Sequence, residues 1–244
     1  MRGGLASAFA VVAVVGAACR SDAPEPPRRE PAPACAGQIA ATGVATYYDA
    51  TGVGSCSLAP SPPPSRDPSH APADRMVAAL NAADYDHAAW CGACLAVSGP
   101  LGEVVVRVVD RCPGCKHGDL DLSREAFAAI APLSDGRTKI AWHLVACPVT
   151  GPVVYQIKPG SNPSWTAIQL RNHRYPIAGL EVRDAQGAYR AIARGDDNYF
   201  VAHGLGPGPY ALRVRDVHGR ALDDAIAAGA GVVRPGAAQF PGCP

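Results

Sequence analysis

Nine cysteines constrain the fold of this chain more than any other feature of its sequence. Four of them form two Cys-x-x-Cys pairs within residues 91–115, "CGACLAVSGPLGEVVVRVVDRCPGC", and the separation of the pairs is in the range of four-thiolate zinc sites. The same cysteines could instead belong to a disulfide framework, which persists only in an oxidising compartment. The compartment therefore decides between a metal site and covalent cross-links.

The N-terminal residues predict export. Arg2 precedes an apolar run at residues 5–18, which is too short to span a bilayer, so residues 1–18 are interpreted as a secretory signal peptide. Small residues stand directly before Cys19, so cleavage would give either a freely secreted protein or a lipoprotein anchored through Cys19. Residues 19–34 are rich in proline and charge and predict a disordered linker. An extracellular location is expected.

Removal of Cys19 leaves an even number of cysteines, which favours disulfides in an exported chain. A zinc site would need reduced thiolates in an oxidising compartment and would leave four other cysteines unexplained. We therefore expect four disulfides, no metal and no other cofactor, although the residue positions alone leave the pairing open. The eight cysteines are Cys35, Cys56, Cys91, Cys94, Cys112, Cys115, Cys147 and Cys243.

The first half of the chain predicts short strands with one helix. The strands are expected at residues 43–48, 103–110 and 138–147. The β-branched run at 103–110 has the pattern of a strand buried on both faces. "MVAALN" at 76–81 predicts a short helical turn behind Asp74, and "DLSREAFAAIA" at 121–131 predicts a helix with Ser123 as its N-cap.

The second half predicts a β-sandwich. "PVTGP" at 148–152 has the composition of a hinge. Six strand-like segments with turn residues between them follow within about seventy residues, a density typical of sandwiches. These segments are "VVYQIKPG", "WTAIQLRNH", "GLEVRDAQG", "AYRAIARGD", "NYFVAHG" and "PYALRVRDVHG". With 26 glycines and 24 prolines, the chain as a whole is expected to be mostly β.

Acidic residues near the end of the buried run could carry chemistry. Asp110 ends that run, Asp121 opens the predicted helix, and His117 lies between them. Two carboxylates near one cleft are the minimum equipment for acid–base work on a glycosidic bond. Each residue also has a structural explanation, since Asp121 could stabilise a helix start, Asp110 a turn, and His117 could simply be solvated. Asp49 is the other acid placed where it could complete a site.

Charge and aromatic residues narrow the class of partner. The net charge of +1 gives no reason to expect nucleic acid or an anionic membrane as a partner. Aromatic residues in the second half either fill a core or form a flat surface for stacking on sugar rings. They are Trp165, Tyr175, Tyr189, Tyr199 and Tyr210. Lys158, beside a turn, could add a polar contact to such a surface.

Taken together, these motifs resemble the expansins, especially the microbial expansin-like proteins. The resemblance is carried over residues 43 to about 240 by "ATYY", "CGACLAVSGP", "VVDRCPGC", "GDLDLS" and "YQIKPGSNPSWTAIQLRNHRYPI". It implies a six-stranded double-psi β-barrel at 35–148, followed at 151–244 by an immunoglobulin-like β-sandwich of carbohydrate-binding family 63. Expansins bind cell-wall polysaccharide, cellulose and matrix glycans such as xylan, and loosen it without hydrolysis. The resemblance therefore implies a monomer that is not an enzyme.

The resemblance also implies site residues. Thr46, Asp110 and Asp121 occupy the positions of the family's loosening site, with Tyr48 beside them as a substrate contact. An aromatic residue that some bacterial members place two residues after the first acid is Cys112 here, which changes one wall of the groove.

The sugar-binding surface of the second domain departs further from the family pattern. Ser164 precedes Trp165 where the family has two adjacent tryptophans, and Asp197 stands where a third aromatic residue is expected. Tyr199 could substitute if its strand presents it on the same face. Lys158 keeps its family position, and we expect weaker binding to crystalline cellulose than a full aromatic triplet would give.

The disulfide pattern of related plant proteins implies two of the four pairs. Those pairs join Cys56 to Cys91 and Cys94 to Cys147. The remaining cysteines would then form Cys112–Cys115 and Cys35–Cys243.

Two enzyme classes with the same barrel remain as alternatives. Family 45 endoglucanases would use Asp121 as the acid and Asp49 as the base. Rare lipoprotein A lytic transglycosylases, which act on peptidoglycan, carry a series similar to "DRCPGCKHGDLDLS", including His117.

Overall fold

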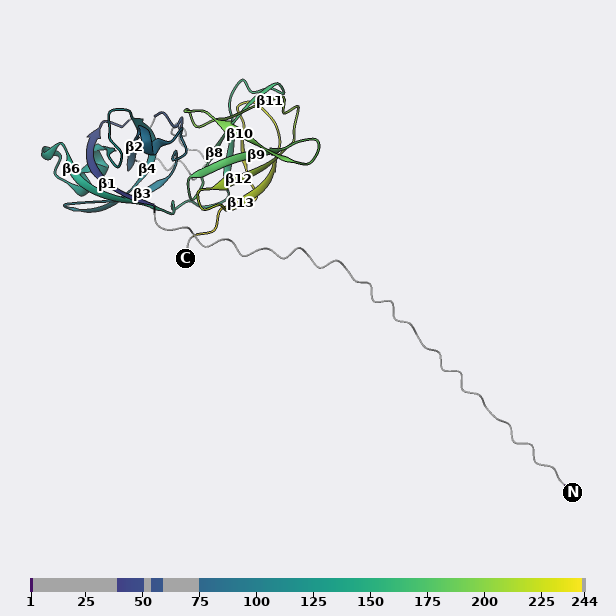
Figure 1. Cartoon of the computed structure of the whole chain (residues 1–244), viewed down its shortest axis with the longest axis horizontal. Coiled ribbons are helices and arrows are strands. Elements are labelled where there is room, and N and C mark those ends of the chain that lie inside the picture. The colour runs from purple at the N-terminus through teal and green to yellow at the C-terminus, as the bar shows by residue number, and fades with distance from the viewer. Residues whose placement is uncertain (2–38, 51–53, 59–74, 243–244) are drawn as a thin grey trace. The chain divides into compact units, whose positions relative to one another are not determined.

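The computed structural model describes residue 1 and residues 39–50, 54–58 and 75–242 (Figure 1). The expected signal peptide, the linker at 19–34, the Cys19 anchor and the Cys35–Cys243 pair lie outside these residues. Within the described ranges, no helix has both the length and the apolar composition needed to cross a membrane.

The first half of the described chain forms a closed six-stranded barrel, drawn in purple to teal in Figure 1. The strand order around the barrel is β1-β5-β2-β4-β3-β6, in which β1 pairs with β5, and β2 with β4, in parallel. The strands are β1 (Ala40–Tyr48), β2 (Val77–Asn81), β3 (Cys94–Gly99), β4 (Gly102–Cys112), β5 (Leu120–Ser123) and β6 (Thr138–Val145). The predicted barrel is confirmed.

Helices are few and short in this part of the chain. The elements are α1 (Ala82–Tyr85), α2 (Arg124–Ile130) and the 3-10 turn η1 (Leu133–Asp135). Ser123 caps α2 as predicted, since its side chain accepts the backbone N–H of Ala126. The helix buries Phe127 and Ile130, and the ring of Tyr47 on β1 packs against Phe127 with centroids 5.0 Å apart. The helix therefore packs against one side of the barrel.

Three local predictions for the barrel are wrong. The segment 76–81 contains strand β2 and not a helical turn, because the residues of β2 are buried between β4 and β5 and so show no helical period. Asp121 lies within β5, and the helix begins only at Arg124. The run at 103–110 is not buried on both faces, since Val105 is 45% exposed. The last finding places one face of β4 at the surface.

The second half forms eight strands in the order β13-β12-β9-β10-β11-β8-β7-β14, drawn in green to yellow in Figure 1. The pairs are antiparallel, and β10 joins β9 on one side to β11 on the other, as in a β-sandwich. The strands are β7 (Val154–Ile157), β8 (Trp165–Arg171), β9 (Ile177–Arg183), β10 (Tyr189–Arg194), β11 (Phe200–His203), β12 (Tyr210–Asp216), β13 (Ala221–Ile226) and β14 (Val233–Pro235). All six predicted segments form strands, and β13 and β14 are additional.

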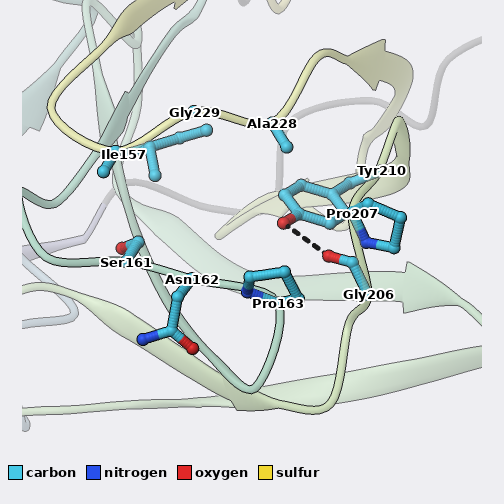
Figure 2. A pocket seen from close by; sticks show the side chains of 10 residues that line it. Ile157, Ser161, Asn162, Pro163, Gly206, Pro207, Tyr210, Ala228 and Gly229 are labelled. Carbon is cyan, nitrogen blue, oxygen red and sulfur yellow. Dashed lines mark hydrogen bonds between the residues drawn. The ribbon is translucent and has the colours of Figure 1, made fainter.

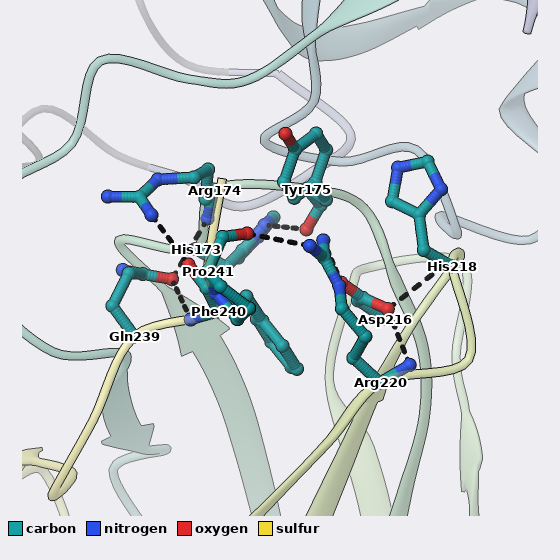
Figure 3. Close-up of polar contacts among 9 residues, drawn as sticks. All are labelled: His173, Arg174, Tyr175, Asp216, His218, Arg220, Gln239, Phe240 and Pro241. Atoms are coloured by element: carbon teal, nitrogen blue, oxygen red, sulfur yellow. Dashed lines mark hydrogen bonds and ion pairs between the residues drawn. The ribbon is translucent and has the colours of Figure 1, made fainter. Parts of the chain in front are cut away.

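A buried ion pair fastens the C-terminal residues to the sandwich (Figure 3). Asp216 and Arg220 are joined by a contact of 2.7 Å between Oδ2 and Nε, and their side chains are 0% and 5% exposed. Arg220 also donates from Nη1 to the carbonyl of Pro241 at 2.6 Å. Arg174 donates from Nη1 to the carbonyl of Phe240 at 2.7 Å. The segment after β14 is therefore held by two arginines.

The barrel and the sandwich belong to one compact unit and share several contacts. The carbonyl of Cys56 in the barrel accepts from Gln169 Nε2 at 3.0 Å. Tyr85 donates its hydroxyl to the carbonyl of Asp196 at 2.8 Å. Arg194, a half-buried residue of β10, donates from Nη1 to the carbonyl of Ala88 at 2.9 Å. These contacts pin the sandwich onto one end of the barrel.

The Asp216–Arg220 pair predicts a large loss of stability when its charge balance is broken. Asp216→Asn keeps the Oδ1 acceptor for nearby backbone N–H groups but removes the carboxylate charge that pairs with the buried Arg220. We expect the free energy of unfolding to fall by about 3 kcal/mol, measured by chemical denaturation. Asp223→Asn, which breaks the more exposed pair with Arg213, is the control and is expected to lose about 1 kcal/mol or less. Equal losses in the two variants would contradict this prediction.

His173 predicts a specific loss of stability in acid. Burial, assisted by the positive charges of Arg107 and Arg194 and opposed by the hydrogen bond to the Tyr175 carbonyl, lowers the pKa of His173 to about 4. The unfolded chain, with an ordinary histidine pKa, therefore binds this proton from about pH 6.5 downward, whereas the folded protein resists it. The free energy of unfolding therefore decreases by about 3 kcal/mol as the pH is lowered through this window. His173→Gln should flatten the pH dependence of the unfolding free energy between about pH 7 and 4, and equal slopes would count against it.

Candidate functional site

Thr46 and the two predicted acids lie in one row across four neighbouring barrel strands. Thr46 on β1 is the register partner of Asp121 on β5, Asp121 is the partner of Ala79 on β2, and Ala79 is the partner of Asp110 on β4. Thr46 Oγ1 donates to Asp121 Oδ1 at 2.7 Å. Both acids are half-buried, and the alanine between them is small. We call these four residues the carboxylate row.

Tyr48 is associated electrostatically with both acids of the row. It lies two residues beyond Thr46 on β1, and so on the same face of that strand. Burial, followed by the negative charges of Asp110 and Asp121, raises the pKa of Tyr48 to about 12. The phenol therefore keeps its proton at physiological pH and is a hydrogen-bond donor beside the carboxylates.

Asp110 also organises the segment 54–58. Its Oδ1 accepts the backbone N–H of Ser55 at 2.7 Å and the backbone N–H of Arg111 at 2.8 Å. Cys56 donates its N–H to the carbonyl of Val109 at 3.1 Å and is bonded to Cys91 by a disulfide. Gly54 permits the close approach, because a Cβ there would lie 2.5 Å from the Val109 oxygen and 2.6 Å from Asp110 Cβ.

The two Cys-x-x-Cys pairs are disulfide-bonded and are not zinc ligands. Three disulfides are present among the described residues, in the pairing that the resemblance implied: Cys56–Cys91, Cys94–Cys147 and Cys112–Cys115. Within the part of the chain that the structure describes, no group of three His, Cys, Asp or Glu residues is arranged to hold a metal. The first pair of cysteines bonds outward to two distant partners, and the second pair closes a loop on itself.

A cavity of about 520 Å³ adjoins the carboxylate row. Thr46 lines it, together with the loop closed by the Cys112–Cys115 disulfide. Asp119 lies on its wall and accepts the backbone N–H groups of Val44 at 2.7 Å and Lys116 at 3.2 Å. The cavity therefore lies beside the Thr46 end of the row, and the disulfide loop forms part of its wall.

The other two predicted acid–base residues are paired elsewhere. Asp49 is 86% exposed and contacts Arg124 Nε at 3.2 Å, at the start of α2. His117 is 75% exposed and contacts Asp84 Oδ1 through Nδ1 at 2.7 Å. The guanidinium of Arg124 also lies 5.0 Å from the ring centre of Tyr47, on the face of β1 opposite Tyr48. The structure therefore pairs Asp49 with the helix and not with the carboxylate row.

On the sandwich, Trp165 and Tyr199 share a face but differ in exposure. Trp165 pairs with His203, and Ala167 pairs with Val201. Since every second residue of a strand faces the same side, Tyr199, two residues before Val201, shares the face of Trp165. Trp165 is half-buried, whereas Tyr199 is 7% exposed, with Lys158 Nζ 4.4 Å from its ring centre. The predicted stacking ring of Tyr199 is thus present on the expected face but covered.

The remaining predicted aromatic residues have structural roles. Tyr175 and Tyr210 are buried in the core, and Tyr189 lies under Arg213, whose guanidinium is 4.0 Å from the ring centre. Figure 2 shows Tyr210 at a cavity of about 290 Å³, where its hydroxyl donates to the carbonyl of Gly206 at 3.1 Å. Asn162, on the opposite wall, accepts the backbone N–H of Trp165 at 3.1 Å. The same loop thus lines this cavity and positions the tryptophan.

Tyr85 connects the barrel site with the sandwich, and the sequence does not signal it. Burial raises the pKa of Tyr85 to about 12, Arg111 opposes the rise, and the charges of Asp196, Asp110 and Asp197 add to it. Arg111 Nη1 lies 3.7 Å from Asp196 Oδ2. The phenol of Tyr85 therefore lies within electrostatic range of acids from both domains. These residues come from distant parts of the chain, which no local pattern reveals.

Comparisons with known proteins give one family and a set of relatives. A family model described as "Lytic transglycolase" matches residues 77–142. Expansin-YoaJ of Bacillus subtilis is 40% identical over 139 residues, covering 57% of this chain and 60% of the relative. Expansin-like protein 1 of Dictyostelium discoideum is 29% identical over 143 residues, covering 55% and 50%. The chain therefore spans only half to three fifths of these curated relatives.

Solved structures match over a greater length. A mutant of the Clavibacter michiganensis expansin in complex with cellohexaose aligns with a TM-score of 0.73 and 31% identity, covering 83% of this chain and 99% of that one. The apo form of the same protein aligns with a TM-score of 0.72 and 32% identity over the same shares. The similarity thus includes both the barrel and the sandwich.

Gly54 is predicted to be essential for the geometry around Asp110. Gly54→Ala places a methyl group against backbone at 2.5 Å, so the 54–58 segment must shift and Ser55 must release Asp110. We expect the unfolding free energy to fall by about 1–3 kcal/mol. Gly114→Ala is the matched control, because nothing lies within 4 Å of its Cβ position. If both glycine variants are as stable as the parent protein, the close approach is not required.

Proposed function

This chain belongs to the expansin family, and on that premise we propose that it binds cell-wall polysaccharide, cellulose or a matrix glycan, and loosens it without cleaving it. The observation that carries the proposal is the carboxylate row, in which Thr46 both lines a cavity of about 520 Å³ and holds Asp121 by a hydrogen bond. A related expansin has been crystallised with cellohexaose, which supports a β-glucan as the class of ligand.

In this proposal, the barrel supplies hydrogen bonds to sugar hydroxyls. Thr46 holds one oxygen of Asp121, so the carboxylate is presented in a fixed orientation as an acceptor. The protonated phenol of Tyr48 donates beside it, and Asp110 shapes the same wall while fixing the 54–58 segment. Trp165 on the sandwich offers an apolar ring to the flat face of a sugar. Such contacts compete with the hydrogen bonds between neighbouring glycans and require no bond cleavage.

Hydrolysis of the family 45 type is the weaker alternative. It needs a base close to the acid, and the candidate base is Asp49. An exposed aspartate that pairs with Arg124 at the start of α2 does not support that role.

Peptidoglycan cleavage is a second candidate, favoured by the description of the matched family model. His117, the residue expected to mark that activity, contacts Asp84 on α1, and this pair could serve proton transfer. Release of anhydro-muropeptides from bacterial sacculi, lost on His117→Ala, would favour this candidate. We propose an extracellular monomer in either case.

Asp121 is predicted to be required for loosening. Asp121→Asn keeps the size of the side chain and removes its charge, so we expect creep of heat-inactivated plant wall strips under load to fall to the buffer level. Asp49→Asn, at an exposed acid of similar position, is the control and should creep like the parent protein. Release of reducing ends by the parent protein, abolished in both variants, would instead establish a hydrolase.

Trp165 is predicted to carry much of the binding by the sandwich. Trp165→Ala removes the half-buried ring, and we expect retention on cellulose to fall by about tenfold. Leu101→Ala, at a residue that is 62% exposed on the barrel, is the control and should bind like the parent protein. The measurement is a depletion assay against cellulose, xylan, chitin and peptidoglycan, and unchanged retention of Trp165→Ala on all four would contradict the role.

A further inference from the structure

An ion pair covers the second aromatic ring on the sugar-facing surface of the sandwich. Lys158 follows β7, and its Nζ lies 2.8 Å from Asp197 Oδ2. The same Nζ lies 4.4 Å from the ring centre of Tyr199, which is only 7% exposed. The other oxygen of Asp197 accepts the backbone N–H of Tyr199 at 3.3 Å. Asp197 is thus bonded both to the ring's own backbone and to the cation above the ring.

The covered ring lies on the same face as Trp165. Tyr199 is two residues before Val201, whose partner Ala167 is two residues after Trp165. Lys158 is held close to this face because its backbone N–H donates to the carbonyl of Ala167 at 2.9 Å. The half-buried ring of Trp165 is therefore partly accessible on this face, whereas the ring of Tyr199 is contacted by the chain's own ammonium group.

We propose that Asp197 is a specificity-determining residue that holds Lys158 on Tyr199 and thereby limits the affinity of this surface for a neutral β-glucan chain. The inference rests on the proposed function. A glycan that lies flat across the face must either leave Tyr199 unused or displace Lys158 from two partners. An aromatic residue at position 197 would add a ring to this face. The aspartate instead holds Lys158 over the ring of Tyr199, so that this ring is not available for stacking.

The strength of this effect follows from the exposure of the pair. The side chains of Lys158 and Asp197 are 37% and 46% exposed, so the pair is only partly desolvated. Ion pairs of this kind change an equilibrium by about two- to fivefold, and salt weakens them. We call the Lys158–Asp197 pair over Tyr199 the latch. Because the pair is weak, a bound glycan can displace Lys158 from the ring.

The test uses Asp197→Asn, which keeps the side-chain oxygen that bonds Tyr199 N–H and removes the charge. We expect cellulose affinity to rise by about two- to fivefold. Raising the salt concentration should increase the affinity of the parent protein and not that of the variant. An Asp197→Asn affinity that is unchanged or lower, while Trp165→Ala still reduces binding, overturns the latch and leaves the proposed function intact.

A second measurement reads the latch without any glycan. The chain has three lysines, Lys116, Lys139 and Lys158, so ¹³C-methylated lysines give few signals. The Lys158 signal, identified by its loss in Lys158→Met, should be shifted by the ring current of Tyr199 and should lose that shift in Asp197→Asn. An unshifted signal in the parent protein overturns the latch directly. If the shift is found but neither protein binds any polysaccharide, both the inference and the proposed function fail.

Discussion

The fold and the site both depend on the way Cys56 is held. Its side chain is bonded to Cys91, its N–H donates to the carbonyl of Val109 beside Asp110, and its carbonyl accepts from Gln169 and Asn198 of the sandwich. The disulfide spans a sequence separation of 35 residues and, in the chain-entropy description, stabilises the fold by about 4 kcal/mol. The residue is completely buried. One residue thus fixes the segment that orients an acid of the site and anchors the second domain.

This arrangement fixes the sandwich to the barrel. The barrel contributes hydroxyl and carboxylate groups in a fixed row, which suit the polar edges of sugars, and the sandwich contributes an aromatic ring, which suits their apolar faces. Tyr85 donates a hydrogen bond to the sandwich, and Arg194 donates one to the barrel. Because Tyr85 is buried and Arg194 is half-buried at this junction, the relative position of the polar and apolar groups is set by the fold.

Local sequence patterns predicted those features that local chemistry determines. The cap at Ser123, the strand of Thr46 and the strands of the sandwich follow from short-range rules, and the strongest motifs led to the family and its disulfides. The helical turn at 76–81 was wrong because "VAALN" is buried on all sides and has no period that distinguishes strand from helix. The roles of Tyr85 and Asp197 could not be predicted, since their partners lie far away in the chain.

The position of Ala79 between the two acids of the carboxylate row determines the distance between them. Asp121 and Asp110 lie on either side of β2, so their backbones are two strand spacings apart, or roughly 10 Å. This spacing is close to the length of a disaccharide unit in an extended β-linked glucan, in which alternate sugars present the same edge. A glycan that crosses the strands would therefore present equivalent hydroxyls to both acids in the same register. The width of β2 therefore sets the distance between the two carboxylates that the barrel offers to a ligand.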